Sequence, residues 1–354
     1  MVKKICMVSF TSSQSVISDT FKEIYLSLKE NENIFFYASK FCLPNEVNNN
    51  TQKFFYEKKL IGFFKIIKFI YKLRNYVIKN KVESIFIFST LPVNSLISLI
   101  MPRYVKVNHY LHDPITHSGE KKSFIALKKY DDLILSMKSS NVFISSNYIK
   151  RDFLKTAFKD KKCTILPLPI VDSLVNYREL SEEKTAIIFF GRIEKYKGLE
   201  WFFNALIKYG NKIKEKKTPI YVLGKGILPE NIYVALNMGF NITIKNEFIS
   251  NRELANFINK SKVSVFPYRD ATGTSAIQTS GAMGVWPILS EVGGLRESSI
   301  ENYSSVIQKD DAKLFVREIE NILERDISNS SIATAYQAKY NIESFSTNLI
   351  KLID

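Results

Sequence analysis

The stretch AIIFFGRIEKYKG, residues Ala186 to Gly198, decides how this chain should fold. It opens with a β-branched and aromatic run, which is typical of a central strand in a parallel sheet. The run ends at Gly191, and a helix is predicted to begin near Leu199. The turn between them opens at the carboxyl end of the strand, where open α/β sheets bind their ligands.

This turn carries three cations, Arg192, Lys195 and Lys197. Cations beside a helix N-terminus suit a diphosphate, because fixed charge and helix dipole act on the same anion. Cations at a sheet edge are also common as solvated surface groups, so the turn alone leaves both interpretations open.

A second stretch, VSVFPYRDATGTSAIQTSGAMGVWPILSEVGGLRE, covers residues 263–297. It predicts a strand, a loop of small residues, a helix, a second strand and then Gly293-Gly294. Together the two stretches resemble the C-terminal domain of family 4 glycosyltransferases, which are retaining enzymes of the GT-B fold that use nucleotide-sugar donors. The resemblance covers the C-terminal half of the chain well and the N-terminal half weakly.

The resemblance implies an α/β protein with the GT-B fold, in which two Rossmann-like domains face each other across a cleft. A length of 354 residues suits two domains. The predicted divisions are an acceptor-binding domain at 1–170, a linker at 171–184, a nucleotide-sugar-binding domain at 185–335, and a C-terminal helix at 336–354 that crosses back to the first domain.

Composition predicts a folded protein that stays in the cytoplasm. Hydrophobic residues make up 45% of the chain, which is enough for two cores. The three cysteines, Cys6, Cys42 and Cys163, have neither metal-ligand spacing nor an even number, which suits a reducing compartment. The N-terminus shows no signal peptide, and no apolar run reaches the roughly 18 residues that span a bilayer.

Positive charge is concentrated in the first half of the chain. Residues 1–170 hold 27 Lys and Arg against 13 Asp and Glu, or +14, whereas residues 171–354 hold 23 against 22, or +1. Such asymmetry indicates that the first half meets a polyanion, either a nucleic acid or an anionic membrane surface.

The segment KKLIGFFKIIKFIYKLRNYVIKNK, residues 58–81, contains no acidic residue and has helical periodicity. A basic amphipathic helix of this kind can lie in a bilayer interface, with Lys65, Lys68 and Lys72 toward anionic head groups. The alternative is a helix that packs its apolar side on the sheet while its lysines face water.

All three histidines lie within nine residues, at His109, His112 and His117. This spacing does not fit a zinc site, so no metal is predicted. Asp113-Pro114 ends the preceding strand and turns the chain toward the predicted cleft. His112 either contacts the donor sugar or phosphate, as a comparable histidine does in the related enzymes, or is a hydrogen-bonded structural residue.

The first loop carries Ser12 and Ser13, where family relatives usually carry glycines. Their hydroxyls can cap the following helix or bond a sugar or phosphate, and both alternatives stay open. We expect acceptor-binding groups in this domain at Ser12, Ser13, Asp113 and His117.

The resemblance also assigns donor-binding positions. Arg192 and Lys197 match the positions that neutralise the donor diphosphate, beside Gly191, and with His112 they form the predicted catalytic set. Further donor contacts are expected at Phe248, Ile249, Gly273, Thr274, Ser275, Ala276, Gln278 and Thr279.

The sequence departs from the family at a motif of two glutamates that usually grips ribose and sugar. Ala271 and Thr279 stand where the two carboxylates would be. Asp270, Gln278 and the Thr279 hydroxyl could substitute in part, so the departure puts the donor identity and the activity itself in question.

The leading hypothesis is a metal-independent retaining glycosyltransferase that uses a UDP- or GDP-linked sugar as co-substrate and needs no other cofactor. Its acceptor would be a glycan, lipid-linked in the manner of a polysaccharide or O-antigen precursor, at the inner face of the cell membrane. A non-catalytic subunit of the same fold, which binds a partner enzyme or a glycan, is the alternative. Nucleic-acid binding ranks third, because the basic segment matches no recognised nucleic-acid motif.

Overall fold

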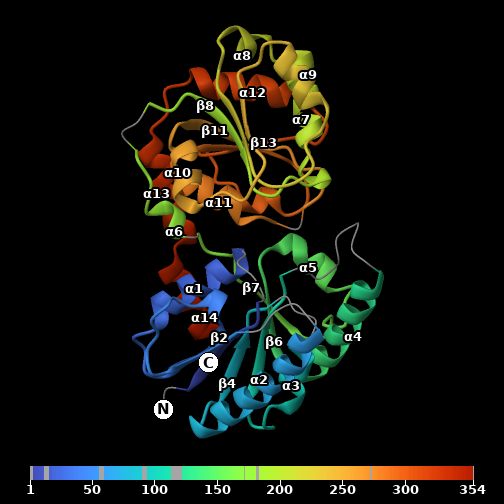
Figure 1. Cartoon of the computed structure of the whole chain (residues 1–354), viewed down its shortest axis with the longest axis vertical. Coiled ribbons are helices and arrows are strands. Elements are labelled where there is room, and N and C mark those ends of the chain that lie inside the picture. Colours follow the sequence, from blue (N-terminus) through green and yellow to red (C-terminus); the bar gives the residue numbers. More distant parts are fainter. Residues whose placement is uncertain are drawn as a thin grey trace. The chain divides into compact units, whose positions relative to one another are not determined.

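The computed structural model describes residues 3–11, 16–55, 60–89, 94–112, 122–170, 172–180, 183–271 and 273–353. These residues form two compact units, each built on its own parallel sheet (Figure 1). The first unit contains Met1–Leu168 and Ile342–Asp354, and the second contains Pro169–Asn341. The prediction of two Rossmann-like α/β domains is therefore confirmed.

The sheet of the first unit has seven strands in the order β3-β2-β1-β4-β5-β6-β7. All neighbours pair in parallel, and β1 and β2 are buried along their whole length, as expected where both faces of a sheet are covered. The strand order reverses between β1 and β4, which makes their carboxyl ends the topological switch point. The strands are β1 (Ile5–Ser9), β2 (Ile34–Ser39), β3 (Thr51–Phe54), β4 (Ser84–Ile87), β5 (Lys106–Tyr110), β6 (Ser139–Ile144) and β7 (Lys162–Ile165).

Helices pack on both faces of this sheet. They are α1 (Val16–Leu28), α2 (Leu60–Lys79), α3 (Asn94–Ile100), α4 (Lys122–Lys138), α5 (Asn147–Phe153) and α14 (Ile342–Ile353), with a 3-10 helix at Lys40–Cys42. One hydrophobic cluster contains Leu73 of α2, Ile97 of α3 and Leu135 of α4. A second cluster contains Phe21 of α1 and Leu349 of α14. The C-terminal helix is therefore part of the first unit's core.

Helix α2 buries the apolar side that the sequence left open to a bilayer. Its residues Ile66, Ile70, Leu73 and Val77 pack in the core of the first unit. Its lysines Lys65, Lys68 and Lys72 are exposed. The packing interpretation is thus right for the apolar side of α2, while its cations remain available to an external anion.

The second unit has six parallel strands in the order β10-β9-β8-β11-β12-β13, with β8 buried at its centre. The strands are β8 (Ala186–Phe190), β9 (Ile220–Leu223), β10 (Ile242–Lys245), β11 (Ser261–Phe266), β12 (Trp286–Ser290) and β13 (Ser305–Ile307). The helices are α6 (Asp172–Val175), α7 (Leu199–Tyr209), α8 (Asn211–Glu215), α9 (Asn231–Asn237), α10 (Asn251–Asn259), α11 (Ser275–Ala282), α12 (Ala312–Glu324) and α13 (Asn329–Tyr340), with 3-10 helices η2 (Lys195–Lys197) and η3 (Leu295–Ser298).

The segments that connect the units have more structure than a linker would. Leu174 and Val175 of α6, inside the range predicted as a linker, pack in the second unit's core. The buried Lys184 Nζ donates to the Met283 carbonyl at 3.2 Å. Helix α13 ends at Tyr340 in the second unit, and only α14 belongs to the first. The second unit runs from Pro169 to Asn341, so it contains residues 336–341 and the described residues of the range predicted as a linker.

Candidate functional site

The turn after β8 lies at the switch point of the second sheet, because the strand order reverses between β8 and β11. Gly191 has φ +102°, a conformation that favours glycine. The Gly191 N–H donates to the Leu223 carbonyl at 3.0 Å, and the Ile193 N–H donates to the Lys225 carbonyl at 2.9 Å. A Cβ on Gly224 would lie 1.9 Å from the Gly191 oxygen, so the two loops approach this closely only because that residue is glycine.

Lys197 is the central cation of this turn. It ends η2, and only 8% of it is exposed. Its ammonium lies 5.4 Å from the centroid of the Tyr268 ring. It also lies 3.0 Å from the position that a Cβ on Gly191 would occupy. Gly198 follows with φ +71°, and a Cβ there would lie 1.9 Å from the Pro267 oxygen. This close contact between backbones fixes the position of the neighbouring Lys197 backbone.

The charge on Lys197 is poorly solvated. Burial lowers its pKa, and the nearby Arg192 guanidinium lowers it further, whereas Tyr196 and Glu194 raise it. Arg192 is exposed, and neither cation forms an ion pair with any residue that the structure describes. Two neighbouring positive charges, one of them desolvated, therefore lack a counter-ion, and a bound anion would relieve both their repulsion and the cost of burial.

Arg269 differs from these two cations because its charge is already paired. Its guanidinium lies 5.1 Å from the centroid of the Trp201 ring and forms an ion pair with Asp310. The backbone N–H of Arg269 donates to the Tyr196 carbonyl at 2.7 Å. Arg269, which follows β11, therefore holds η2 in place.

Two tyrosines that the sequence analysis missed line the site. Tyr268 is 2% exposed, and Tyr196 packs edge-on against it with ring centroids 6.1 Å apart. Burial raises the pKa of Tyr268, and the Thr274 hydroxyl and the Arg192 charge oppose that rise. The Tyr268 hydroxyl is buried and has no hydrogen-bond partner among the described residues, so Tyr268 contacts the turn after β8 through its ring. Tyr268 follows the end of β11 as Arg192 follows the end of β8. The sequence therefore contained a signal that both residues lie at the same edge of the sheet.

The predicted Gly273–Ala276 stretch forms the start of α11. Thr274 is its N-cap, with a hydroxyl that accepts from the Ala276 N–H at 3.2 Å. Gly273 is exposed, and Ser275 is half-buried. Backbone N–H groups at a helix N-terminus favour anions, so this segment suits a phosphate or a sugar hydroxyl.

The residues at and beside the absent carboxylates face inward. Ala271 is 3% exposed and Thr279 is 6% exposed. Gln278 is buried, and in the orientation that satisfies its amide, its oxygen accepts from Ser298 Oγ at 3.1 Å while its nitrogen donates to the Thr274 carbonyl at 2.5 Å. Gln278 therefore stabilises the first turn of α11, and the suggested substitution for a ligand-binding carboxylate finds no support in its contacts.

The loop before α10 carries two of the predicted donor contacts, Phe248 and Ile249. Phe248 is 77% exposed, and Ile249 packs on the core. Asn246 Oδ1 accepts from the Gly226 N–H at 2.9 Å, and Ser250 is the N-cap of α10, where its hydroxyl accepts from the Glu253 N–H. The loop is therefore fixed at both ends and presents the Phe248 ring to solvent at the carboxyl edge of the sheet.

The histidine cluster separates into different environments. His109 on β5 is 3% exposed and stacks on Phe158 with centroids 6.1 Å apart, and burial lowers its pKa to about 3. It is thus a neutral core residue. His112 lies half-buried just after β5 in the first unit. The predicted acceptor residues Ser12, Ser13, Asp113 and His117 lie outside the described residues.

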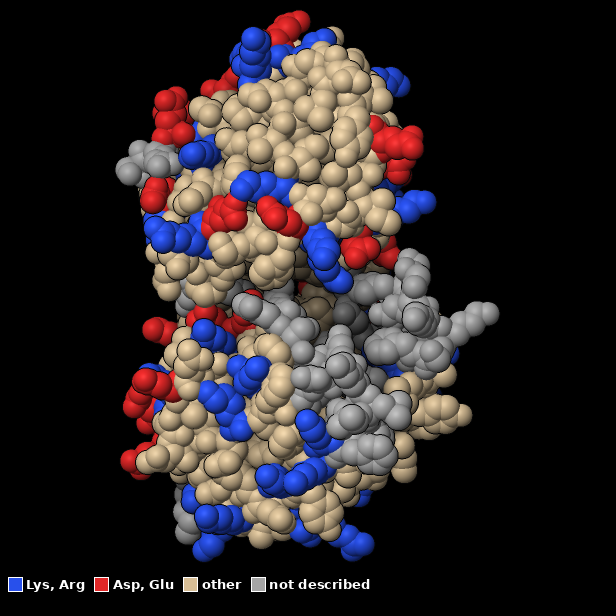
Figure 2. Space-filling view, in the orientation of Figure 1, with Lys and Arg blue, Asp and Glu red and all other residues tan. Residues whose placement is uncertain are grey.

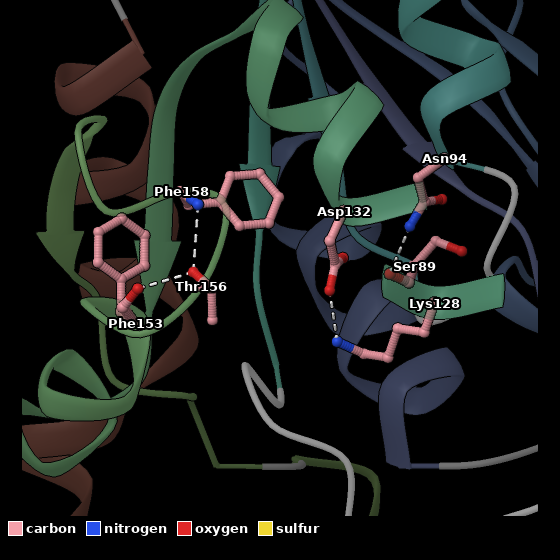
Figure 3. A network of polar contacts seen from close by, with 7 residues as sticks. All are labelled: Ser89, Asn94, Lys128, Asp132, Phe153, Thr156 and Phe158. Carbon is pink, nitrogen blue, oxygen red and sulfur yellow. Dashed lines mark hydrogen bonds and ion pairs between the residues drawn. The ribbon is translucent and has the colours of Figure 1, made fainter. Parts of the chain in front are cut away.

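Polar contacts hold the end of β4 in the first unit (Figure 3). Asn94 Nδ2 donates to the Ser89 carbonyl at 3.1 Å, and the Ser89 hydroxyl donates to the Phe10 carbonyl at 2.9 Å. Asn94 Oδ1 is buried and has no partner within the described ranges. The switch point of the first sheet therefore holds a buried acceptor atom that no described residue uses.

The described residues show neither a metal site nor a membrane-spanning helix. They contain no group of three or more His, Cys, Asp or Glu side chains that could hold a metal ion. None of their helices is long and apolar enough to cross a membrane. Cys6, Cys42 and Cys163 are free thiols.

Residues 184–325 match the family model described as "Glycosyl transferases group 1". The match covers most of the second unit, including the turn after β8 and the start of α11. No curated protein matches the sequence significantly.

Solved structures resemble the chain over its full length. Sucrose-phosphate synthase from Thermosynechococcus elongatus has 15% identity and a TM-score of 0.68, with 99% of this chain and 98% of that chain covered. Anabaena HepE in complex with UDP has 11% identity and a TM-score of 0.69, with 99% of each covered. The lipopolysaccharide outer core galactosyltransferase WaaB has 10% identity and a TM-score of 0.65, with 98% and 99% covered. The chain thus has the GT-B fold of these glycosyltransferases.

The desolvated charge of Lys197 predicts a pH-dependent stability. Its folded pKa lies below its ordinary value of 10.5, so the unfolded chain holds more protons between the two pKa values. The free energy of unfolding should therefore rise with pH across that window. Lys197→Met should remove this rise and stabilise the protein at pH 7 by about 0.5–2 kcal/mol.

Urea unfolding followed by tryptophan fluorescence at pH 7 and pH 10 measures both effects, because Trp201 and Trp286 lie in the second unit. Lys195→Met, on the exposed side of the same turn, is the matched control and should change neither. A Lys197→Met protein that is less stable than wild type at pH 7 would contradict this account of the site.

Proposed function

We propose that this protein is a retaining glycosyltransferase that transfers a sugar from a nucleoside diphosphate to a glycan acceptor. The observation that carries the proposal is that Arg192 and Lys197, at the switch point of the second sheet, form no ion pair with the residues that the structure describes. The family match over residues 184–325 and the GT-B fold support the same function.

The chemistry requires positive charge where these side chains lie. When the glycosidic bond of the donor breaks, the nucleoside diphosphate leaves and negative charge grows on its oxygens. Cations held in place before the reaction stabilise that charge more in the transition state than in the ground state. Lys197 is fixed by packing against Tyr268 and is partly desolvated, so its charge needs little reorganisation. We assign leaving-group stabilisation to Arg192 and Lys197 and propose that the reaction needs no metal ion.

The remaining donor contacts follow from the same sheet edge. We propose that the exposed Phe248 ring and Ile249 hold the nucleobase of a UDP- or GDP-linked donor. The N–H groups of Gly273 and Ser275, with the Thr274 hydroxyl, would contact phosphate or sugar, while the Ala276 N–H is held by the Thr274 cap. Since Ala271 and Thr279 provide no carboxylate, the donor hydroxyls would meet neutral groups. HepE has been solved with UDP, which supports a nucleotide of this class.

We place the acceptor on the first unit. His112 at the end of β5 would contact the donor sugar or phosphate, and Asn94 Oδ1 offers an unused acceptor for a sugar hydroxyl. Acceptor groups at Ser12, Ser13, Asp113 and His117 remain proposals. The galactosyltransferase WaaB acts on a lipopolysaccharide outer core, and a glycan acceptor of polysaccharide or O-antigen type is proposed here by analogy.

We further propose that the first unit works at an anionic membrane surface in the cytoplasm, where lipid-linked glycans are found. Lys65, Lys68 and Lys72 of α2 are exposed and form no ion pair within the described part of the chain. Figure 2 shows Lys and Arg side chains spread across the visible face of the first unit. Each lysine near an anionic leaflet contributes about 1 kcal/mol, so this charge is sufficient for reversible binding.

A second candidate function is a non-catalytic subunit that binds nucleotide or glycan. It is favoured by Ala271 and Thr279, because a buried alanine and a buried threonine replace both carboxylates. Release of nucleoside diphosphate from a panel of UDP- and GDP-sugars distinguishes the two functions.

Arg192→Ala and Lys197→Ala should each lower the rate of nucleoside diphosphate release by about 10²–10³ at saturating donor, because each removes charge from the leaving group. Lys195→Ala removes an exposed cation from the same turn and should have little effect. Wild-type turnover in either of the first two variants would refute the assignment.

Addition of EDTA to the wild-type reaction should leave the rate unchanged, since the side-chain cations supply the charge that a bound metal ion would otherwise provide. The same assay with added Mg²⁺ is the control. A rate that EDTA abolishes and Mg²⁺ restores would show that metal independence is wrong.

Replacing Lys65, Lys68 and Lys72 with Glu should release the protein from anionic vesicles while leaving donor hydrolysis in solution nearly intact. Reversal of three charges removes roughly 1 kcal/mol per lysine and adds repulsion, and the effect should fade in high salt. The matched control reverses Lys208, Lys309 and Lys313, which are exposed in the second unit. Equal binding of both variants in cosedimentation would show that the α2 lysines are only solvated.

A further inference from the structure

Helix α4 leaves one apolar side uncovered. Ala126, Tyr130, Leu133 and Met137 recur every three or four residues, so they lie along one side of the helix. Exposure reaches 69% for Tyr130, 51% for Leu133 and 73% for Met137. We call these four residues the α4 stripe. Leu135, on another side of the helix, packs in the core, so α4 does not need the stripe to attach to the sheet.

Exposed apolar groups extend beyond the α4 stripe. Leu127, the residue of α4 that follows Ala126, is 52% exposed, and Leu99 on α3 is 47% exposed. Helix α3 packs directly against α4. Contiguous exposed apolar surface on a soluble domain usually marks an interaction site.

The charges around the α4 stripe select its partner. Both acids of α4 are engaged within the domain: Asp131 accepts from the Ser95 N–H at 2.9 Å and from Ser95 Oγ at 2.5 Å, and Asp132 pairs with Lys128 at 2.8 Å. The exposed Lys129 and Lys138 have no acidic partner among the described residues. The stripe is therefore bordered by positive charge without a balancing carboxylate.

A second copy of the chain is a poor occupant, because it would bring the same lysines together across the contact. An anionic bilayer provides both requirements, since its head groups attract Lys129 and Lys138 and its interface accepts the apolar side chains. Helices α2, α3 and α4 contribute to one core cluster, so they cover the same face of the sheet. The lysines of α2 and the α4 stripe can thus belong to one docking surface.

We propose that the α4 stripe inserts into the interfacial region of an anionic membrane, with Lys129 and Lys138 at the head groups. This inference rests on the proposed membrane association. It adds apolar insertion by α4 to the attraction between the α2 lysines and anionic lipids. Helix α2 buries Ile66, Ile70, Leu73 and Val77 and contributes charge beside the exposed Ile67, Tyr71 and Ile78, whereas α4 contributes a stripe of exposed apolar side chains.

The test compares Tyr130→Gln/Leu133→Gln/Met137→Gln with wild type in cosedimentation with phosphatidylglycerol–phosphatidylcholine vesicles at low and high salt. Gln keeps helix propensity and adds no charge. The matched control is Tyr233→Gln/Val234→Gln/Met238→Gln, at exposed apolar positions of the second unit. Thermal unfolding and donor hydrolysis in solution verify that both variants fold.

We expect the α4 variant to bind anionic vesicles at least about 100-fold more weakly, from three apolar side chains that each contribute about 1–2 kcal/mol on insertion. The loss should persist at high salt, unlike the effect of the α2 charge reversals. Binding equal to wild type, or wild type that binds no vesicle, overturns the proposal. So does a wild-type dimer in sedimentation velocity that the α4 variant alone abolishes, which would assign the stripe to a second copy. Donor hydrolysis in solution reports separately on the proposed enzyme activity.

Discussion

The structure of the candidate site depends on one unfavourable interaction, the burial of the Lys197 ammonium beside Arg192 with no ion-pair partner among the residues that the structure describes. Desolvation lowers the pKa of Lys197, and the charge of Arg192 adds to this effect while Tyr196 and Glu194 oppose it, so burial disfavours the protonated side chain. A bound diphosphate group would offset that cost. A cation that is costly to bury when the site is empty and stabilised by the ligand is the arrangement expected of charge held in place for an anionic leaving group.

Backbone geometry makes this burial possible. Gly191 adopts φ +102° and leaves room for the lysine head group, and Gly198 lets its backbone touch that of Pro267. Gly224 allows the loop after β9 to support the turn. These close approaches consist of backbone against backbone, so a side chain at Gly198 or Gly224 would displace the turn that carries both cations. The site therefore belongs to the rigid part of the second unit.

Much of the second unit could be predicted from the sequence, because its signals are local. The run from Ala186 to Phe190 forms the central strand β8, and the helix predicted near Leu199 begins at that residue as α7. Contacts between distant residues could not be predicted. The Lys197 ammonium contacts the Tyr268 ring, and the two residues follow the neighbouring strands β8 and β11. Gln278 is engaged by a hydrogen bond from Ser298.

The first unit shows the same division between local and tertiary signals. The periodicity of α2 predicted an amphipathic helix correctly but could not reveal which partner covers its apolar side. Three histidines close in sequence appeared to be one cluster, yet the pleat of β5 turns His109 into the core. The sequence did not predict the α4 stripe, because apolar and charged residues alternate around this helix and leave no clear apolar side in the pattern.

Calorimetric titration with UDP, GDP and the corresponding nucleosides tests the central claim most directly, since only the diphosphates carry the charge that the site is proposed to hold. The account predicts that at least one diphosphate binds about 100-fold or more tightly than its nucleoside, a difference of about 2.7 kcal/mol or more. Equal affinity for nucleoside and diphosphate would contradict it, because Arg192 and Lys197 would then contribute nothing to binding.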